Sequence, residues 1–291
     1  MEKRSIVFCG TPDFAVPSLR ALVQDKNFNV SLVITQPDRP VGRSKELTAP
    51  PVKTAALELG IPVLQPEKLN AEFATIAASI DRPDFLVVVA YGQLLSQAVL
   101  EWPLIAPINV HGSLLPRWRG ASPIEHAVLH GDAETGIAVQ RMVKELDAGP
   151  VLGSVSTPIG ERETAIQLRQ RLAPMGATLL IDVLSQPLHE TPQPNDGITV
   201  CRTLSREDGR ADPTTMTAER IDRMVRAFVP WPGVTTTVQG HTIKILETSL
   251  EPTAASTPLA CANGTTLHLV SVQEAGKKAI SGAEWARGMR S

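Results

Sequence analysis

The stretch Phe85-Leu86-Val87-Val88-Val89-Ala90 is an apolar run in which no polar side chain alternates with the hydrophobic ones. Such a run is typical of a central strand in a parallel sheet that is covered on both faces. Before it, the same criteria predict strands at 4–9, 29–35 and 62–64, separated by helices at 14–23, 52–59 and 71–80. This alternation predicts an α/β domain with a Rossmann-like, doubly wound and mostly parallel sheet.

The pattern continues toward the C-terminus and then changes. Strands are predicted at 108–110, 137–142 and 151–158, and helices at 123–129 and 164–184. Pro187, Pro192, Pro194 and Gly197 break the next stretch, so we expect a first domain at 1–185 and a linker at 186–205. The remaining residues, 206–291, hold one predicted helix at 218–227 and short β-prone segments at 234–238, 242–248, 258–260, 266–272 and 277–280. Many short strands predict a small, closed, OB-like β-barrel.

Composition excludes several classes of protein. The chain has 291 residues, 43% of them hydrophobic, which suits two globular domains. A formal net charge of -2 argues against coating nucleic acid by bulk charge, although a local basic segment remains compatible with it. The three cysteines are far apart, which favours a reducing compartment, and no signal peptide or apolar run of membrane length is present. We therefore expect a cytoplasmic protein that does not contact a membrane.

Three polar residues form a candidate catalytic group. Asn109 and His111 are two positions apart at the end of a predicted strand, so their side chains point to the same side, where α/β sheets bind ligands. Asp147 lies in a loop between two later strands. An amide, an imidazole and a carboxylate without an activated Ser or Cys suit direct acyl transfer to an external nucleophile. Asn109 and His111 would donate to the oxyanion, and Asp147 would orient His111 and help to receive a proton.

Each of these residues also has a simpler interpretation. A histidine after a strand is often a structural group, and Asp before Ala-Gly is often a turn former. His126 and His130 are spaced i, i+4 on a predicted helix, which would suit a metal, but no glutamate in the HExxH manner and no third ligand accompany them. The sequence therefore predicts no metal site. The GxGxxG glycines of a nucleotide-binding dehydrogenase are also missing.

A longer motif surrounds this group. The run Asn109-Val110-His111-Gly112-Ser113-Leu114-Leu115-Pro116-Arg117-Trp118-Arg119-Gly120-Ala121-Ser122-Pro123-Ile124, followed by Leu146-Asp147-Ala148-Gly149, closely resembles the signature of the formyltransferases that use 10-formyltetrahydrofolate. Across both predicted domains the chain resembles the members that formylate the methionine of initiator methionyl-tRNA for translation initiation. Gly112, Ala148, Pro150 and Glu125 depart from the usual pattern, and none of them belongs to the catalytic group.

The resemblance implies residue roles. Asn109, His111 and Asp147 match the catalytic residues of the family, while Ser113, Leu114, Leu115, Pro116 and Tyr91 match its folate side. The loop at 36–51 resembles a basic loop that enters the tRNA acceptor stem, with Arg39, Arg43 and Lys45 as tRNA contacts. The expected formyl donor is 10-formyltetrahydrofolate, with no metal, and the expected form is a monomer.

Two alternatives remain at this point. The fold and the catalytic group would also suit a formyltransferase that acts on an amino sugar nucleotide, and a catalytically silent tRNA-binding module would retain the same domains. Without the resemblance, the basic loop is simply a solvated face. In the second domain, basic residues would form a groove for the tRNA backbone only if they share one face; these are Arg206, Arg210, Arg223, Arg226, Lys244, Lys277 and Lys278.

Overall fold

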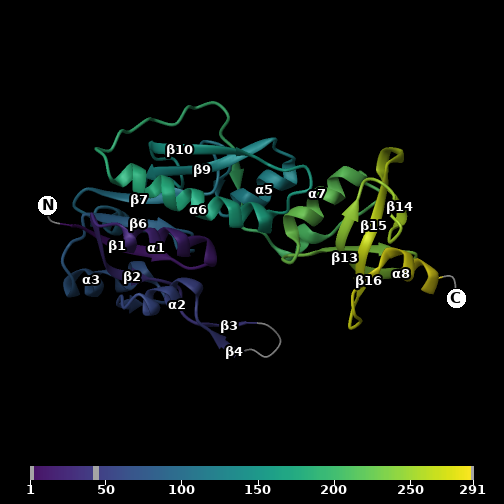
Figure 1. The fold of residues 1–291 in the computed structure, drawn as a ribbon, viewed down its shortest axis with the longest axis horizontal. Helices are drawn as coiled ribbons and strands as arrows, with labels where there is room; N and C mark the ends of the chain where they lie inside the picture. Colours follow the sequence, from purple (N-terminus) through teal and green to yellow (C-terminus); the bar gives the residue numbers. More distant parts are fainter. Residues whose placement is uncertain (1–2, 42–45, 290–291) are drawn as a thin grey trace. The chain divides into compact units, whose positions relative to one another are not determined.

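The computed structural model describes residues 3–41 and 46–289 and is drawn in Figure 1. The chain divides into two compact units, which we describe separately. Unit 1 comprises Met1–Ala121, Thr135–Thr157 and Arg169–Cys201, and unit 2 comprises Ser122–Glu134, Pro158–Leu168 and Arg202–Ser291. Within the described ranges, no helix is both long enough and apolar enough to span a membrane.

The main sheet of unit 1 is mostly parallel. Its strand order is β10-β9-β7-β6-β1-β2-β5 among the described residues. Its strands are β1 (Arg4–Gly10), β2 (Phe28–Ile34), β5 (Val63–Leu64), β6 (Phe85–Val89), β7 (Ala106–His111), β9 (Glu134–Arg141) and β10 (Val151–Pro158). Strand β1 pairs parallel with β2 and β6, and β6 pairs parallel with β7, whereas β7 and β9 are antiparallel. The predicted mostly parallel α/β sheet is therefore confirmed, and the apolar run forms an interior strand over Phe85–Val89, as expected, with Ala90 just beyond it.

Helices pack on this sheet through buried apolar side chains. They are α1 (Val16–Gln24), α2 (Pro51–Glu58), α3 (Leu69–Ser79), α4 (Gln97–Leu100) and α6 (Ala165–Leu184). Alternate strand residues such as Val7, Leu86 and Val88 form one cluster with Leu69 and Ile76 of α3. On α6, a Cβ at Gly176 would lie 3.1 Å from Val110 Cγ1, so this glycine lets the helix approach β7 closely.

The basic loop contains regular structure that the sequence did not indicate. Strands β3 (Arg39–Val41) and β4 (Glu46–Thr48) pair antiparallel, with Arg39 opposite Thr48. Both strands are too short to show a period of two in their side chains, so periodicity does not reveal them. Arg43 and Lys45, two of the three expected tRNA contacts here, lie outside the described residues.

The segment expected to be a linker is anchored to unit 1 over its second half. Strand β11 (Val200–Cys201) pairs parallel with β8 (Arg119–Gly120), and Thr191 forms an antiparallel bridge with Val151. Proline and glycine prevent a long regular element here, yet the backbone polar groups still find partners. We name residues 191–201 the strap, because one end pairs with Val151 of β10 and the other with β8.

Unit 2 contains helices and an antiparallel sheet. Its main elements are α5 (Pro123–His130), α7 (Ala218–Phe228), β12 (Val234–Val238), β13 (His241–Ser249), β14 (Thr257–Ala260), β15 (Thr266–Glu274), β16 (Ile280–Ser281) and α8 (Gly282–Gly288). The strand order is β12-β13-β15-β14, and β16 pairs with β15. The C-terminal β domain is thus present. In the pairs described, β12 and β14 are not bonded to each other, so closure of a barrel is not among the observations.

Candidate active site

Asn109 and His111 lie at the carboxyl end of β7, an interior strand of the unit 1 sheet. They are two residues apart, and they are 8% and 5% exposed. Burial of two polar side chains requires hydrogen-bond partners in the protein. Asp147, which lies near both side chains, comes from a segment that is distant in sequence.

Asp147 reaches both residues from the loop between β9 and β10. Its Oδ1 accepts a hydrogen bond of 3.2 Å from Asn109 Nδ2, and its Oδ2 lies 3.7 Å from His111 Nδ1. The backbone of Asp147 has a φ of 51°, in the left-handed region that aspartate tolerates better than most residues. The structure therefore brings the three expected catalytic residues together.

Two further groups donate to the Asp147 carboxylate, and the sequence reasoning missed both. Gln140 Nε2 donates to Oδ1 at 2.9 Å, and the Gly120 backbone N–H donates to Oδ2 at 2.8 Å. Gln140 is opposite Asn109 in the antiparallel pairing of β7 and β9. The alternation of β9 would have placed its side chain on the same face as Asn109, but only once the register was known.

Gly120 has to be a glycine at this position. Its φ is 119°, and a Cβ added there would lie 2.1 Å from the Cys201 carbonyl oxygen of the strap. The close approach of the strap therefore excludes any side chain at this residue. The same close approach fixes the position of the Gly120 N–H, which donates to Asp147 Oδ2.

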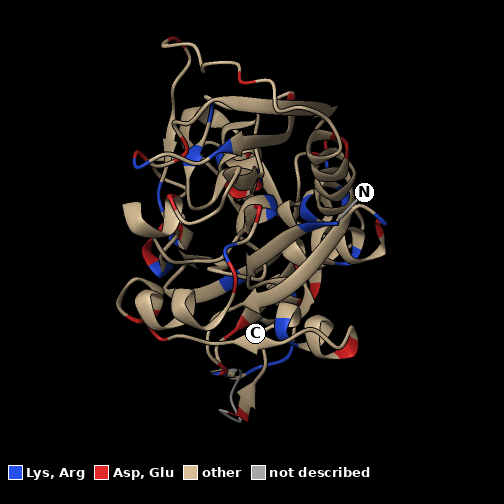
Figure 2. Cartoon of the chain, turned by 90° about the vertical axis from the view of Figure 1, so that its left-hand side faces the viewer, with Lys and Arg blue, Asp and Glu red and all other residues tan. Residues whose placement is uncertain are grey.

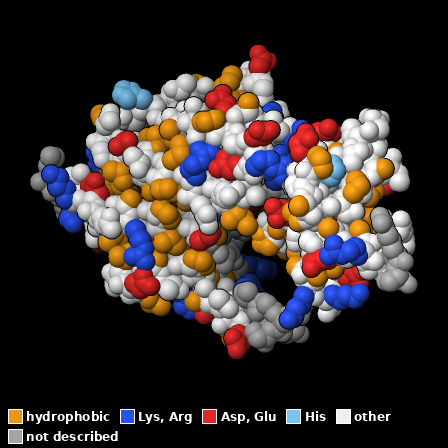
Figure 3. Space-filling model, turned by 45° about the vertical axis from the view of Figure 1, so that its right-hand side comes forward, with side chains coloured by type: hydrophobic (Ala, Val, Ile, Leu, Met, Phe, Trp, Pro, Cys, Tyr) orange, Lys and Arg blue, Asp and Glu red, His pale blue; other side chains and the backbone are white. Residues whose placement is uncertain are grey.

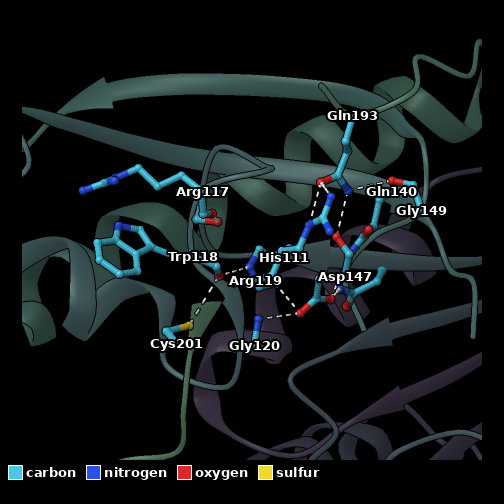
Figure 4. Close-up of polar contacts among 12 residues, drawn as sticks. His111, Arg117, Trp118, Arg119, Gly120, Gln140, Asp147, Gly149, Gln193 and Cys201 are labelled. Carbon is cyan, nitrogen blue, oxygen red and sulfur yellow. Dashed lines mark hydrogen bonds and ion pairs between the residues drawn. The ribbon is translucent and has the colours of Figure 1, made fainter. Parts of the chain in front are cut away.

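The opposite nitrogen of the His111 ring is fixed by a backbone carbonyl. His111 Nε2 lies 2.8 Å from the Trp118 oxygen, which also accepts from Cys201 Sγ at 3.4 Å. A carbonyl oxygen only accepts, so Nε2 carries a hydrogen and Nδ1 is the nitrogen that faces Asp147. Figure 4 shows His111 between Trp118 and Asp147. A proton gained by the ring would be placed on Nδ1, toward the carboxylate.

The residues expected on the folate side occupy a tight turn and the core. Ser113 is buried and its Oγ donates to Arg117 O at 2.5 Å, whereas Leu114, Leu115 and Pro116 are half-buried. The Tyr91 side chain is buried in the hydrophobic cluster, and this burial raises the pKa of its hydroxyl. Its backbone oxygen accepts from Thr11 Oγ1 and Gln36 Nε2. Tyr91 therefore offers its backbone oxygen, and not its side chain, to the hydrogen-bond donors around it.

Basic residues expected to contact tRNA are partly paired with carboxylates. Arg39 Nη2 lies 2.9 Å from Glu67 Oε2, and both side chains are exposed. In unit 2, Arg210 pairs with Glu207, Arg226 with Asp222, and Lys277 with Glu274. Figures 2 and 3 show basic and acidic residues interspersed along the ribbon and over the face drawn. These views do not show one continuous basic groove.

The two histidines considered for metal binding are engaged with backbone. His126 Nδ1 lies 2.8 Å from Ser122 O, and His130 Nδ1 lies 2.9 Å from His126 O, with the rings stacked 6.0 Å apart. Burial is the main cause of a lowered pKa at His126. Over residues 3–41 and 46–289, no three His, Cys, Asp or Glu side chains are grouped as metal ligands.

Comparisons with known proteins give a consistent result. The formyl transferase family model matches residues 3–184, and the formyl transferase C-terminal domain model matches 203–290. A methionyl-tRNA formyltransferase from Magnetococcus marinus is 43% identical over 298 aligned positions, covering 97% of this chain and 95% of the relative.

Two solved structures share the fold at low sequence identity. An N-formyltransferase from Helicobacter canadensis, in complex with folinic acid and dTDP-3-aminofucose, is 15% identical with a TM-score of 0.68, covering 92% of this chain and 99% of its own. A methionyl-tRNA formyltransferase from Clostridium thermocellum is 13% identical with a TM-score of 0.61, covering 93% and 99%. At these identities the structural likeness concerns the fold alone.

Proposed function

The chain belongs to the formyl transferase family, and from this premise we propose that it transfers the formyl group of 10-formyltetrahydrofolate to the α-amino group of methionine on initiator tRNA. The product is N-formylmethionyl-tRNA. The observation that carries the proposal is the 43% identity to a methionyl-tRNA formyltransferase across 97% of this chain. The arrangement of Asn109, His111 and Asp147 supplies the chemistry that this transfer needs.

The proposed mechanism is direct attack by a neutral amine. Its nitrogen adds to the formyl carbon, and the bond from that carbon to N10 then breaks, so no covalent enzyme intermediate forms. Asn109 uses one amide hydrogen for Asp147 and keeps a second for the oxyanion. His111, once protonated on Nδ1, stabilises the same negative charge.

Asp147 is proposed to assist the transfer of a proton from the attacking amine to the departing folate. The nitrogen that attacks loses a proton as the new bond forms, and N10 of the folate gains one as it leaves. The Asp147 carboxylate lies 3.7 Å from His111 Nδ1, so a proton held on this nitrogen between the two events would face a negative charge. Its own position is fixed by Gln140 and Gly120.

The folate is proposed to bind beside these residues, on the turn at Ser113–Pro116 and near the backbone of Tyr91. An acceptor atom supports this fit: Gln140 Oε1 is buried without a hydrogen-bond partner among the described residues. A donor-rich heterocycle such as a pterin would suit an unpaired acceptor next to Asp147. The half-buried Leu114 and Leu115 offer apolar surface for its ring.

The tRNA is proposed to use the β3/β4 hairpin and the C-terminal domain. Arg39 begins the hairpin, and Arg43 and Lys45 belong to the same loop in the sequence.

We propose residues 1–185 as the catalytic domain, 186–205 as the linker and 206–291 as a tRNA-binding OB-like barrel. Two register shifts in β13, which curve a strand, support a partly open barrel. We also propose a cytoplasmic monomer that does not contact a membrane, which the free cysteines suit.

The deciding experiment offers labelled 10-formyltetrahydrofolate with three acceptors: methionyl initiator tRNA, methionyl elongator tRNA and an amino sugar nucleotide. We expect rapid transfer to the initiator tRNA only. Transfer only to the sugar would select the alternative substrate class. Transfer to none of the three, with a protein that still binds tRNA, would identify a silent binding module.

A further inference from the structure

Gln193 of the strap is bonded to both segments that hold the candidate active site. Its Nε2 donates to Asp147 O and to Gly149 O, each at 2.7 Å. Its Oε1 accepts from Arg119 Nε at 3.0 Å and from Arg119 Nη2 at 2.8 Å. One amide group therefore connects the Asp147 loop to the segment next to β7 (Figure 4).

The orientation of this amide is fixed by chemistry. Arg119 only donates, and two backbone carbonyls only accept, so the oxygen has to face the guanidinium and the nitrogen the loop. The Arg119 side chain is 11% exposed, so water competes little for these bonds. A glutamate would keep the contact with Arg119 but would repel both carbonyl oxygens.

The two segments joined by Gln193 determine the distance between His111 and Asp147. Trp118 and Gly120 flank Arg119: the Trp118 oxygen binds His111 Nε2, and the Gly120 N–H binds Asp147 Oδ2. The remaining gap from His111 Nδ1 to Asp147 Oδ2 is 3.7 Å, beyond a hydrogen bond. Small movements of either segment would open or close this gap.

The loop also needs support because its backbone is constrained. Asp147 has a φ of 51°, and a Cβ at Gly149 would lie 1.8 Å from Arg141 O. A conformation of this kind persists when surrounding contacts hold it. The two hydrogen bonds from Gln193 are accepted by the backbone oxygens of Asp147, the residue with the left-handed φ, and of Gly149, two residues later.

From these contacts we infer that Gln193 is a positioning residue for formyl transfer, acting through Asp147, and that the strap is part of the active-site structure rather than a passive linker. This inference rests on the proposed function. Gln193 fixes where the Asp147 carboxylate lies relative to His111 when the proton moves. It does not touch the reacting atoms.

The test measures single-turnover rates and KM values for the full-length protein with folate donor and initiator tRNA. For Gln193→Ala we expect a rate about tenfold lower, because small misplacements of catalytic groups are costly, with both KM values within about twofold. Gln193→Glu should lower the rate at least as much while retaining side-chain size. Gln186→Ala is the matched control and should leave the rate unchanged. Gln186 is an exposed glutamine of the same expected linker, and none of the site contacts described above involves it.

A double-mutant cycle separates positioning from general destabilisation. In an Asp147→Asn background, Gln193→Ala should cost less than about twofold, because Gln193 acts through the carboxylate that is already gone. An equal loss in both backgrounds, an unchanged rate in Gln193→Ala, or a change confined to KM would overturn the inference. If Gln193→Ala does not fold, judged by thermal unfolding, the same cycle is run with Gln193→Glu. Absence of transfer by the unaltered protein would contradict the proposed function instead.

Discussion

Two carboxylates, Asp147 in unit 1 and Asp222 in unit 2, have similar burial but different partners. Their side chains are 8% and 2% exposed. Asp222 accepts from Arg162 Nη1 at 2.7 Å, Arg226 Nε at 3.0 Å and Thr248 Oγ1 at 2.8 Å. Asp147 accepts from two side-chain amides and one backbone N–H.

The charges of these partners explain the different roles. A guanidinium is always protonated, so the negative charge of Asp222 is always balanced and is unavailable for chemistry. None of the donors that the described residues bring to the Asp147 carboxylate is a guanidinium, and its titratable neighbour is His111. The charge of Asp147 would therefore be balanced when the imidazole holds a proton, as in the proposed mechanism. Asp147 is thus placed for the proposed proton exchange, whereas the ion pairs of Asp222 stabilise unit 2.

The most direct way to break this comparison is to neutralise Asp147. We expect Asp147→Asn to lower the rate of formyl transfer by about 1,000-fold, because the protonated imidazole loses its counter-charge while the volume is kept. Thermal unfolding should change little. A rate within tenfold of the unaltered protein would show that Asp147 is a turn former and not a catalytic group.

The corresponding change at Asp222 should have the opposite pattern. Asp222→Ala leaves Arg226, a largely buried cation, without its partner, and we expect the free energy of unfolding to fall by about 3 kcal/mol. The rate per folded molecule should stay the same. Denaturant unfolding with a parallel activity assay measures both, and a selective loss of rate would remove the distinction between the two carboxylates.

His111 sharpens the comparison, because it is the titratable partner that Asp222 lacks. His111→Ala should lower the transfer rate by about 100-fold, because the positive charge proposed to stabilise the oxyanion is lost, with tRNA affinity nearly intact. Rapid-quench assays and a tRNA filter-binding titration would check the two quantities. An unaltered rate would exclude His111 from catalysis.

Asp208, a partly buried carboxylate whose partner Arg202 is exposed, provides the baseline. Arg202 pairs with it and, as the main cause, lowers its pKa to about 2. A lowered folded-state pKa adds stability above the unfolded value of about 4, and this is lost as pH falls through about 2. Asp208→Asn should therefore cost less than about 1 kcal/mol at pH 7, since solvent screens the pair. The difference from the unaltered protein should shrink between pH 4 and pH 2 in denaturant titrations, and a constant difference would exclude the ion pair as its source.

Sequence patterns predicted the parts of the molecule that local chemistry determines. The buried strand Phe85–Val89, the helix Ala165–Leu184 and the shared side of Asn109 and His111 follow from periodicity and strand geometry. Asp147 was selected by its chemistry and by the resemblance, and its place beside β7 was not predicted by periodicity, because its backbone conformation and its distance from β7 are not local properties. For α8, a readable signal was missed: Ser281 and Glu284 form a capping box at its start.

The remaining site residues could not be predicted because they depend on pairing between distant segments. Gln140 meets Asn109 through the register of β7 and β9, and Gln193 reaches Asp147 across 46 residues of sequence. The prolines around Gln193 indicated a linker, and composition alone does not show that such a segment bonds to the site. In the C-terminal β domain, the pattern likewise does not specify which strands pair with one another.

The pairing of β11 with β8 affects where this protein can be divided by gene truncation. A fragment that stops at Ser185 would include every residue of the sheet in unit 1, yet Trp118 N–H would lose Thr199 Oγ1, its acceptor at 2.8 Å. Ala121 N–H would lose the Cys201 carbonyl in the same way. A fragment extended to Cys201 retains both bonds. The last segment of unit 1 therefore ends at Cys201, 17 residues after the end of α6 at Leu184.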